Sequence, residues 1–334
     1  MHAIRVFRLG SLFALIVALS AVVLQADDWP GFRGPNRDGV CHEKGLSKEW
    51  PKHGPKLLWK VNGLGVGYSA PAVVGNVLYT MGEKDDQEWV FALNVSREGK
   101  QLWASSIGPI RNSGNGFPGP RSTPTIDGSR LYTLGIAGDI VCMELKRGRI
   151  VWHYDVVKDF GGRVPSWGYA ESVLVDGPLV VCTPGGPKAT IAAINKKNGR
   201  LVWASPVGDP AAYASVIKVA VGKSKQYVNL TGKGVIGVDA RNGKFLWRYD
   251  APASRVANCS TCVTSGDTVF AASGYGTGGG LVRIEPSGNG FAAEQVYFTK
   301  KMKNHHGGMV LVGGFLYGCS DPSVLTCLSS SKFG

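Results

Sequence analysis

The chain has 334 residues, of which 44% are hydrophobic, and its formal net charge is +13 at pH 7. Its lysines and arginines are spread over turns rather than gathered in a stripe with interleaved aromatics, so a nucleic-acid-binding surface is excluded. Seven cysteines are a low density and an odd number, which excludes a disulfide-based scaffold.

The N-terminus has the organisation of a secretory signal peptide. Arg5 and Arg8 precede an apolar run over 9–24, and small and acidic residues follow at Gln25, Ala26 and Asp27. We predict a signal peptide over 1–26. The alternative is a retained anchor helix, but about 16 apolar residues are fewer than the roughly 20 that span a bilayer. We therefore expect a periplasmic or secreted protein that does not span the membrane after cleavage.

Residues 27–53 are rich in glycine, proline and charge and show no alternation of apolar and polar residues. They are predicted to form an irregular N-terminal extension that wraps the outside of the molecule. Residues 54–61, which include Trp59, are predicted to form a lone strand. From residue 54 to residue 334 we expect a single all-β domain.

A repeat dominates the rest of the sequence. A glycine is followed four positions later by tryptophan at Trp103, Trp152, Trp203 and Trp247, with spacings between 44 and 51 residues. Such a period is typical of propeller blades or helical arrays. Within each unit, short β-branched runs flank turn pairs such as Asp-Gly and Gly-Asn, which favours hairpins. Each unit thus contains four predicted strands.

Complete units are predicted over 69–108, 122–158, 171–206, 214–250 and 261–300, and a partial sixth begins at 309. A four-stranded sheet of this size cannot bury both of its faces alone, so neighbouring units must stack. We expect the repeated tryptophan to be the wedge between neighbouring blades.

The repeat resembles the blade of pyrroloquinoline-quinone (PQQ) type propellers, with an apolar strand, an aspartate, a Thr-Gly-Lys-like turn and a docking tryptophan. Segments 29–40, 160–175, 274–280 and 304–314 are similar to those of secreted planctomycete PQQ-binding-like propellers, which are related to the propeller lipoprotein of outer-membrane assembly. The resemblance implies an eight-bladed ring, of which this chain would be a truncated version. The alternative is closure at six blades, with residues 56–61 completing the last.

In a propeller, the segments that precede each first strand meet at one face near the axis. Here they are unusually rich in aromatic, cationic and imidazole side chains. The candidate binding residues are Tyr68, Arg121, Trp167, Tyr169, Glu171, Tyr213, His305 and His306, with Asn258, Ser69 and Ser122 nearby. This set is typical of a small-molecule site. In the alternative, purely structural interpretation, the aromatics fill the channel and Arg121 pairs with Glu171.

No metal site is expected. Adjacent residues of an extended segment point in opposite directions, so at most one of His305 and His306 should face the axis. Cys259 and Cys262 have no second cysteine pair at zinc-site spacing. The other strand cysteines, Cys142, Cys182, Cys319 and Cys327, are expected to be buried.

One further motif is a false match. The sequence GYGTGG at 274–279 fits a dinucleotide-binding pattern, but no helix follows it.

The sequence is compatible with three functions. The favoured one is a non-catalytic binding or assembly scaffold at the cell envelope, with envelope proteins or polymers as partners and no resident cofactor. The alternative is a PQQ-dependent quinoprotein oxidoreductase of the alcohol or sugar dehydrogenase type, for which the resemblance implies PQQ, Ca²⁺, several acidic ligands and an adjacent cysteine pair. Here Ser260 and Thr261 separate the cysteines, and Glu171, with Asp209 nearby, supplies few oxygens for calcium. Sugar or polyphenol binding by the axial aromatics is a third hypothesis.

Overall fold

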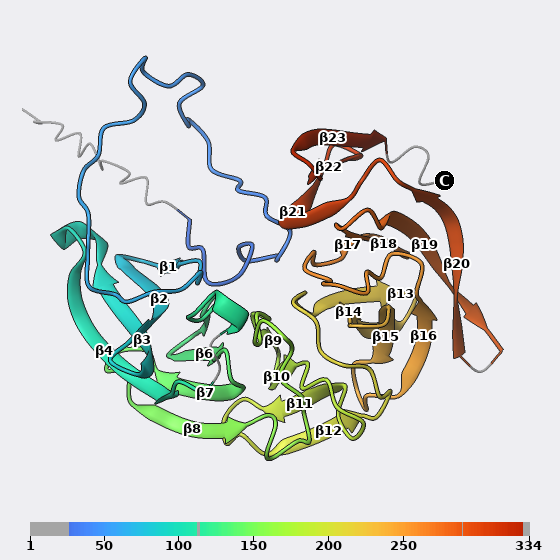
Figure 1. Cartoon of the computed structure of the whole chain (residues 1–334), viewed down its shortest axis with the longest axis horizontal. Helices are drawn as coiled ribbons and strands as arrows, with labels where there is room; N and C mark the ends of the chain where they lie inside the picture. Colours follow the sequence, from blue (N-terminus) through green and yellow to red (C-terminus); the bar gives the residue numbers. More distant parts are fainter. Residues whose placement is uncertain (1–26, 112–113, 289, 330–334) are drawn as a thin grey trace, which may run out of the picture.

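The computed structural model describes residues 27–111, 114–288 and 290–329, so the predicted signal peptide lies outside the described residues. The described residues form six antiparallel sheets, five with four strands and one with three. In Figure 1 the sheets follow one another as the blades of an arc, with β4, β8, β12, β16 and β20 along its outer contour. This arrangement confirms the predicted β-propeller built from four-stranded blades.

Within each sheet, consecutive strands pair in chain order, as hairpins joined by short turns require. The first three blades contain β1 Ala72–Val74, β2 Val77–Lys84, β3 Gln87–Asn94, β4 Lys100–Pro109, β5 Thr125–Asp127, β6 Arg130–Leu134, β7 Asp139–Glu144, β8 Ile150–Asp155, β9 Leu174–Asp176, β10 Leu179–Cys182, β11 Ile191–Asn195 and β12 Leu201–Ser205. The remaining three contain β13 Ile217–Val221, β14 Ser224–Leu230, β15 Val235–Asp239, β16 Phe245–Tyr249, β17 Val263–Ser265, β18 Thr268–Ser273, β19 Gly278–Ser287, β20 Gly290–Thr299, β21 Asn304–Val312, β22 Phe315–Ser320 and β23 Val324–Ser329.

The predicted boundaries of the first five units agree with these blades to within a few residues. The sixth blade begins at Asn304, five residues before the predicted start, because the histidine-containing segment belongs to β21. Two 3-10 turns, η1 Val95–Arg97 and η2 Gly114–Gly116, are the helical elements of the described residues.

The repeated tryptophan and the turn glycine meet across the seam between blades. The glycine after β7, Gly148, has a positive φ of 67°, and a Cβ added to it would come closer than 3.0 Å to the indole of Trp103 in the preceding blade. Gly243 repeats this contact with Trp203, and a Cβ at Gly199 would come closer than 3.0 Å to Tyr154 and would meet the indole of Trp152 at 3.0 Å. The predicted wedge is therefore confirmed for three of the tryptophans.

Trp247 departs from this pattern. Its indole N–H donates to Gln226 of its own blade over 2.6 Å. In the seam that follows, Tyr249 lies against Gly280 of β19, where an added Cβ would collide with the phenol. Trp247 and Tyr249 both belong to the buried cluster that contains Val269, Val282 and Ile284 of the fifth blade. Trp247 therefore lies in this seam as predicted, but its indole does not pack on a turn glycine there.

Residues 54–61 do not form the predicted lone strand. They make no strand pairing with any of the described residues. Trp59 nevertheless packs on Gly99, the turn glycine of the first blade, as the other indoles pack on theirs. The segment therefore contributes the tryptophan of a preceding blade without the strand pairing.

The N-terminal extension does not wrap the outside of the molecule. Trp29 forms an isolated antiparallel bridge with Val73 of β1, and the carbonyl of Pro30 accepts the Ile126 N–H of β5 over 2.7 Å. In Figure 1 the first part of the extension, in the darkest blue, passes on the concave side of the arc between β1 and β21, and the part that follows runs out beyond the blades. The first part therefore ties the first two blades together from within.

Two arginines of the extension form hydrogen bonds with more distant blades. Arg37 donates to the carbonyls of Ser172 over 2.7 Å and Val173 over 3.1 Å, in the third blade. Arg33 donates to the carbonyl of Met309 in the sixth blade. Burial lowers the pKa of Arg37 to about 10, although the nearby carboxylate of Glu171 opposes the shift. The extension thus bonds to blades at both ends of the arc.

The glycine and indole contact gives a matched stability test. Gly148→Ala should lose more stability than Gly128→Ala, because both glycines have positive φ but nothing lies within 4 Å of a Cβ at Gly128. The left-handed backbone costs about 1–2 kcal/mol in each variant, and the indole clash should add about 1–3 kcal/mol at Gly148. Urea unfolding measures both. Equal losses would contradict the seam contact as the reason for this glycine.

Candidate functional site

The segments before each first strand are held beside one another by hydroxyl groups. Ser172 Oγ accepts the Thr123 N–H over 2.9 Å, Ser215 Oγ accepts the Ser172 N–H over 3.0 Å, and Thr261 Oγ1 accepts the Ser215 N–H over 3.0 Å. Each bond joins one blade to the next, and all four residues are buried. Buried backbone N–H groups require such partners, so these hydroxyls fix the axial segments relative to one another.

Hydroxyl groups also connect the axial segments of the first two blades and of the last two. The hydroxyl of Ser69 donates to the carbonyl of Ser122 over 2.7 Å, from the first blade to the second. The hydroxyl of Ser260 lies 3.1 Å from the carbonyl oxygen of His305, and it also bonds to the Asn304 side chain. The loops of all six blades are thus connected through short polar side chains.

One part of the axial surface combines an arginine with tyrosines. The Arg121 guanidinium lies 5.4 Å from the ring centroid of Tyr68, which is 60% exposed. Arg121 also donates to the carbonyls of Gly119 and Phe117. Burial lowers the pKa of Arg121, while Tyr68 and Tyr213 act in the opposite direction. The cation is therefore partly desolvated and lies against aromatic faces.

Trp167 and Tyr213 extend this surface across the next two blades. Their rings meet edge to face with centroids 5.9 Å apart, and the Trp167 backbone N–H lies 3.4 Å from the Tyr213 hydroxyl. Burial raises the pKa of Tyr213, and the groups that act on it electrostatically include Cys259, Arg121 and Tyr275. The Tyr213 backbone N–H donates to the Asn258 carbonyl over 3.0 Å, so the aromatic surface adjoins the loop before β17 of the fifth blade.

The fifth and sixth blades add two histidines and a thiol. His305 and His306 stack with ring centroids 3.9 Å apart, and Tyr275 meets His305 edge on at 4.5 Å. One ligand atom from each of Cys259, His305 and His306 lies within 4.8 Å of the other two. Burial raises the pKa of the Cys259 thiol to about 12.

The expectation that the two histidines point in opposite directions was wrong. The pairing of β21 with β22 jumps from Asn304 opposite Ser320 to Met309 opposite Gly318, so the residues between them bulge out of the ladder. Gly308 has a positive φ of 67° within this bulge. The alternation of a regular strand therefore does not apply to this segment.

Tyr169 and Glu171, two of the sequence candidates, lie in the interior rather than in the exposed cluster. The hydroxyl of Tyr169 donates to the Pro184 carbonyl over 2.7 Å. Glu171 is 2% exposed and accepts the N–H groups of Thr183 over 2.6 Å and Val216 over 3.2 Å. Both residues thus join structural elements.

The pairing of Arg121 with Glu171 that the alternative, purely structural interpretation required is not formed, because each residue has other partners. The cation that acts on Glu171 is Arg37 of the N-terminal extension, which lowers the pKa of this carboxyl. Burial dominates, however, and raises the pKa of Glu171 to about 7. Arg37 lies in an irregular segment outside the repeats, so the repeat pattern alone could not predict that it lies near Glu171.

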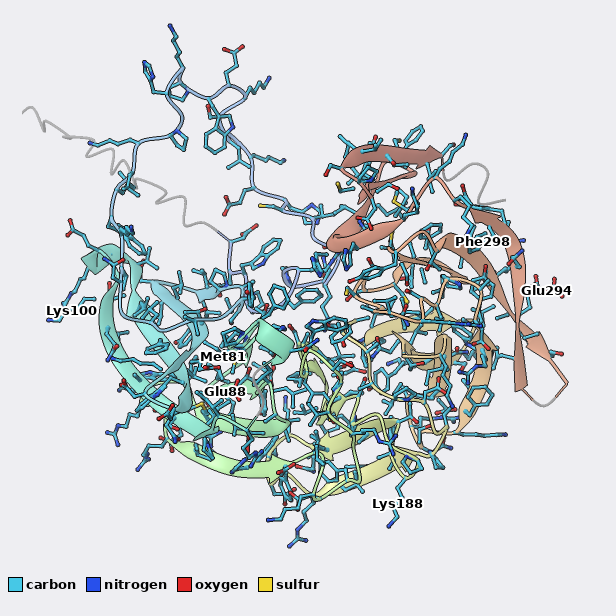
Figure 2. The ribbon with its side chains drawn as sticks, viewed as in Figure 1. Met81, Glu88, Lys100, Lys188, Glu294 and Phe298 are labelled. Atoms are coloured by element: carbon cyan, nitrogen blue, oxygen red, sulfur yellow. The ribbon has the colours of Figure 1, made fainter. Side chains whose placement is uncertain are left out.

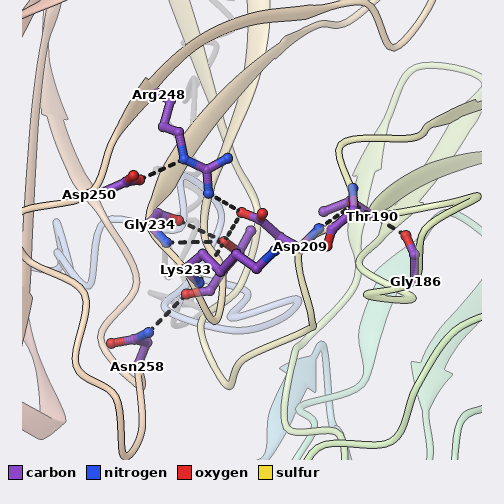
Figure 3. A network of polar contacts seen from close by, with 10 residues as sticks. Gly186, Thr190, Asp209, Lys233, Gly234, Arg248, Asp250 and Asn258 are labelled. Carbon is purple, nitrogen blue, oxygen red and sulfur yellow. Dashed lines mark hydrogen bonds and ion pairs between the residues drawn. The ribbon is translucent and has the colours of Figure 1, made fainter.

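The side chains of Asp209 and Asn258 also form hydrogen bonds within the protein. Asp209 Oδ2 accepts the Thr231 hydroxyl and an Arg248 N–H, each over 2.6 Å (Figure 3). The Asn258 side-chain amide donates to the Thr231 carbonyl over 2.9 Å. Both residues are about 1% exposed. They support the axial loops and are not open to a ligand.

Sequence reasoning did not select Cys259, Tyr275 or Asp321 as site residues. Tyr275 lies in the turn between β18 and β19, within the GYGTGG segment, and no helix follows that turn, as predicted. Among the described cysteines, Cys142 and Cys182 are buried as expected, whereas Cys319 and Cys327 are exposed. These two lie on β22 and β23 of the three-stranded sheet.

Glu88 on β3 was also missed by the sequence analysis. It is fully buried, and its two carboxylate oxygens lie 2.9 and 3.1 Å from the backbone nitrogen of Ile136 in the second blade. Figure 2 shows Glu88 on the inner side of the arc and Lys100, Lys188 and Glu294 at its periphery. Burial raises the pKa of Glu88 to about 7; the Ile136 N–H opposes the shift.

This raised pKa predicts how stability depends on pH. The folded state holds the Glu88 proton more tightly than the unfolded state, so the stabilisation is complete below the unfolded pKa and is lost as pH rises through about 7. Between pH 5 and 8 the wild type should lose on the order of 3 kcal/mol relative to Glu88→Gln. Urea unfolding at several pH values measures this difference. A pH-independent difference, or the same behaviour for peripheral Glu294→Gln, would contradict it.

Comparison with known families gives one match that covers most of the chain. Residues 86–332 match the family described as outer membrane protein assembly factor BamB. The chain is 24% identical over 262 residues to BamB of Burkholderia pseudomallei, covering 65% of each protein. It is 25% identical over 243 residues to the quinoprotein alcohol dehydrogenase PedH of Pseudomonas putida, covering 71% of this chain and 35% of PedH. The chain thus spans less than two thirds of either relative.

Solved structures agree on the fold. BamB from Moraxella catarrhalis aligns with a TM-score of 0.52 at 18% identity, covering 76% of this chain and 68% of that one. A quinohemoprotein alcohol dehydrogenase from Comamonas testosteroni aligns with a TM-score of 0.54 at 12% identity, covering 90% of this chain and 58% of that one. Both support the propeller architecture.

Over the described residues, no helix has the length and apolar character needed to cross a membrane.

Proposed function

The chain belongs to the family of the outer membrane protein assembly factor BamB, and we propose that it is an exported, non-catalytic binding or assembly scaffold of the cell envelope. Its ligand or partner contacts the axial surface formed by Tyr68, Arg121, Trp167, Tyr213 and Tyr275. The observation that carries this proposal is the chemistry of that surface. It combines aromatic faces and one arginine, whereas Glu171 and Asp209 are engaged by internal partners.

Surfaces of this composition favour recognition over chemistry. Tyrosine, tryptophan and arginine are the residue types enriched where proteins bind partners, because they combine large apolar area with polar or cationic groups. Tyr68 and Tyr275 are 60% and 47% exposed, so both remain open to a partner. The proposed partners are envelope proteins or polymers, or a small molecule with aromatic or sugar character.

The residues present do not fit PQQ with calcium. Calcium takes six to eight oxygen ligands, but both oxygens of Glu171 accept backbone N–H groups, and Oδ2 of the buried Asp209 accepts from Thr231 and Arg248. Cys259 and Cys262 are separated by two residues, and both are free thiols. We therefore derive no redox step at this surface.

Titration with PQQ separates the two functions. The scaffold proposal predicts no micromolar binding of PQQ, with or without Ca²⁺, in absorbance and calorimetric titrations of the mature protein. Trp167→Ala is the matched variant, because Trp167 lies on the axial surface and contacts Tyr213. Micromolar binding that disappears in this variant would overturn the proposal in favour of a quinoprotein.

Site-directed cross-linking tests where a partner docks. A photoreactive residue replacing Tyr68 or Tyr275 should give adducts with envelope components when the full chain is exported in a bacterial host. The same residue replacing Phe245, which is 43% exposed on the outer strand β16, should not. Adducts of equal yield from all three positions, or from Phe245 alone, would contradict docking at the axial surface.

A further inference from the structure

Cys259, His305 and His306 come together from two different blades. Cys259 lies in the loop before β17, and the two histidines lie in the bulge of β21. Their ligand atoms lie within 4.8 Å of one another. The Ser260 hydroxyl, next to Cys259, bonds to the backbone of His305 and the side chain of Asn304, so the two segments are locked together beside the cluster.

The environment of His305 is that of a metal-ligating imidazole. Its Nε2 atom is buried and has no hydrogen-bond partner among the described residues. Its other ring nitrogen, Nδ1, lies 3.9 Å from the Asp321 carboxylate. At this distance Asp321 makes no hydrogen bond to the ring, but its negative charge lies on the side of His305 away from Nε2, as the carboxylates behind histidine ligands do. A buried polar atom without a partner is otherwise costly.

We propose that Cys259 Sγ, His305 Nε2 and one ring nitrogen of His306 form a binding site for a borderline divalent metal ion of the zinc class. Thiolate and imidazole are the ligands that Zn²⁺ prefers. The proposal goes beyond the scaffold function and does not rest on it.

The geometry requires only side-chain movement. Metal distances of about 2.0–2.3 Å in a tetrahedral site place ligand atoms roughly 3.3–3.8 Å apart. The atoms here lie within 4.8 Å of one another, so each pair must approach by about 1.5 Å at most to reach these separations. His306 is exposed and can rotate off its stack with His305 to supply this movement.

Three protein ligands leave a fourth position for an exchangeable group. Structural zinc sites are closed by four protein ligands, whereas sites that bind water or an added ligand keep one position open. Here the cluster adjoins Tyr275, whose ring contacts His305. The open position would therefore receive water or the anionic end group of a molecule bound on the axial surface.

Cobalt provides the direct test, because Co²⁺ in a tetrahedral thiolate site gives intense visible bands and a sulfur charge-transfer band. The reduced, mature protein should bind Co²⁺ in equimolar amount with this spectrum, and Zn²⁺ should displace it. Cys259→Ser should abolish the charge-transfer band, and His305→Ala should weaken Zn²⁺ binding at least tenfold in competition with a chelator.

The chain contains its own control. Cys41 and His42 are adjacent and exposed in the N-terminal extension, and the double variant C41S/H42A should retain both the spectrum and the affinity. Thermal unfolding monitors the fold of every variant. An unchanged cobalt spectrum in folded Cys259→Ser, loss of the spectrum in the double variant, or an octahedral spectrum in the wild type would each overturn the proposal.

Discussion

The contact between an indole and the turn glycine of the following blade is the interaction on which the rest of this structure depends. A side chain at Gly148, Gly199 or Gly243 would come within 3.0 Å of the tryptophan of the preceding blade, and the same turns require positive φ. Because one contact satisfies both a packing requirement and a backbone requirement, the seams among the first four blades have a fixed register. Blades stacked in a fixed register bring the loops before their first strands to one face.

Those loops are then connected by groups that a ligand cannot use. The hydroxyls of Ser172, Ser215 and Thr261 each accept a backbone N–H from the neighbouring blade, and the carboxylate of Glu171 bonds to two backbone N–H groups. Most of these buried polar side chains near the axis therefore form hydrogen bonds that hold the blades together. The side chains that stay accessible are aromatic, cationic, imidazole and thiol groups, which favours binding over acid–base chemistry.

This difference between buried structural residues and accessible residues explains which site residues could be predicted from the sequence. Tyr68, Trp167 and Tyr213 lie in the loops where the repeat placed them, because loop position follows directly from the blade period. Glu171 lies in the same segment as Trp167 but faces the interior, and only its partners Thr183 and Val216 distinguish it. Side-chain direction within an irregular loop depends on contacts that no local pattern records.

The sequence by itself determined the strand order, the blade boundaries and the tryptophan seams, because period, turn glycines and alternating apolar runs are local signals. Only the tertiary structure decided the path of the N-terminal extension, the bulge that stacks His305 on His306, and the approach of Cys259 to both. These features join segments tens or hundreds of residues apart, as when Arg33 bonds to the Met309 carbonyl. Such meetings depend on how the blades stack, which no short stretch of sequence encodes.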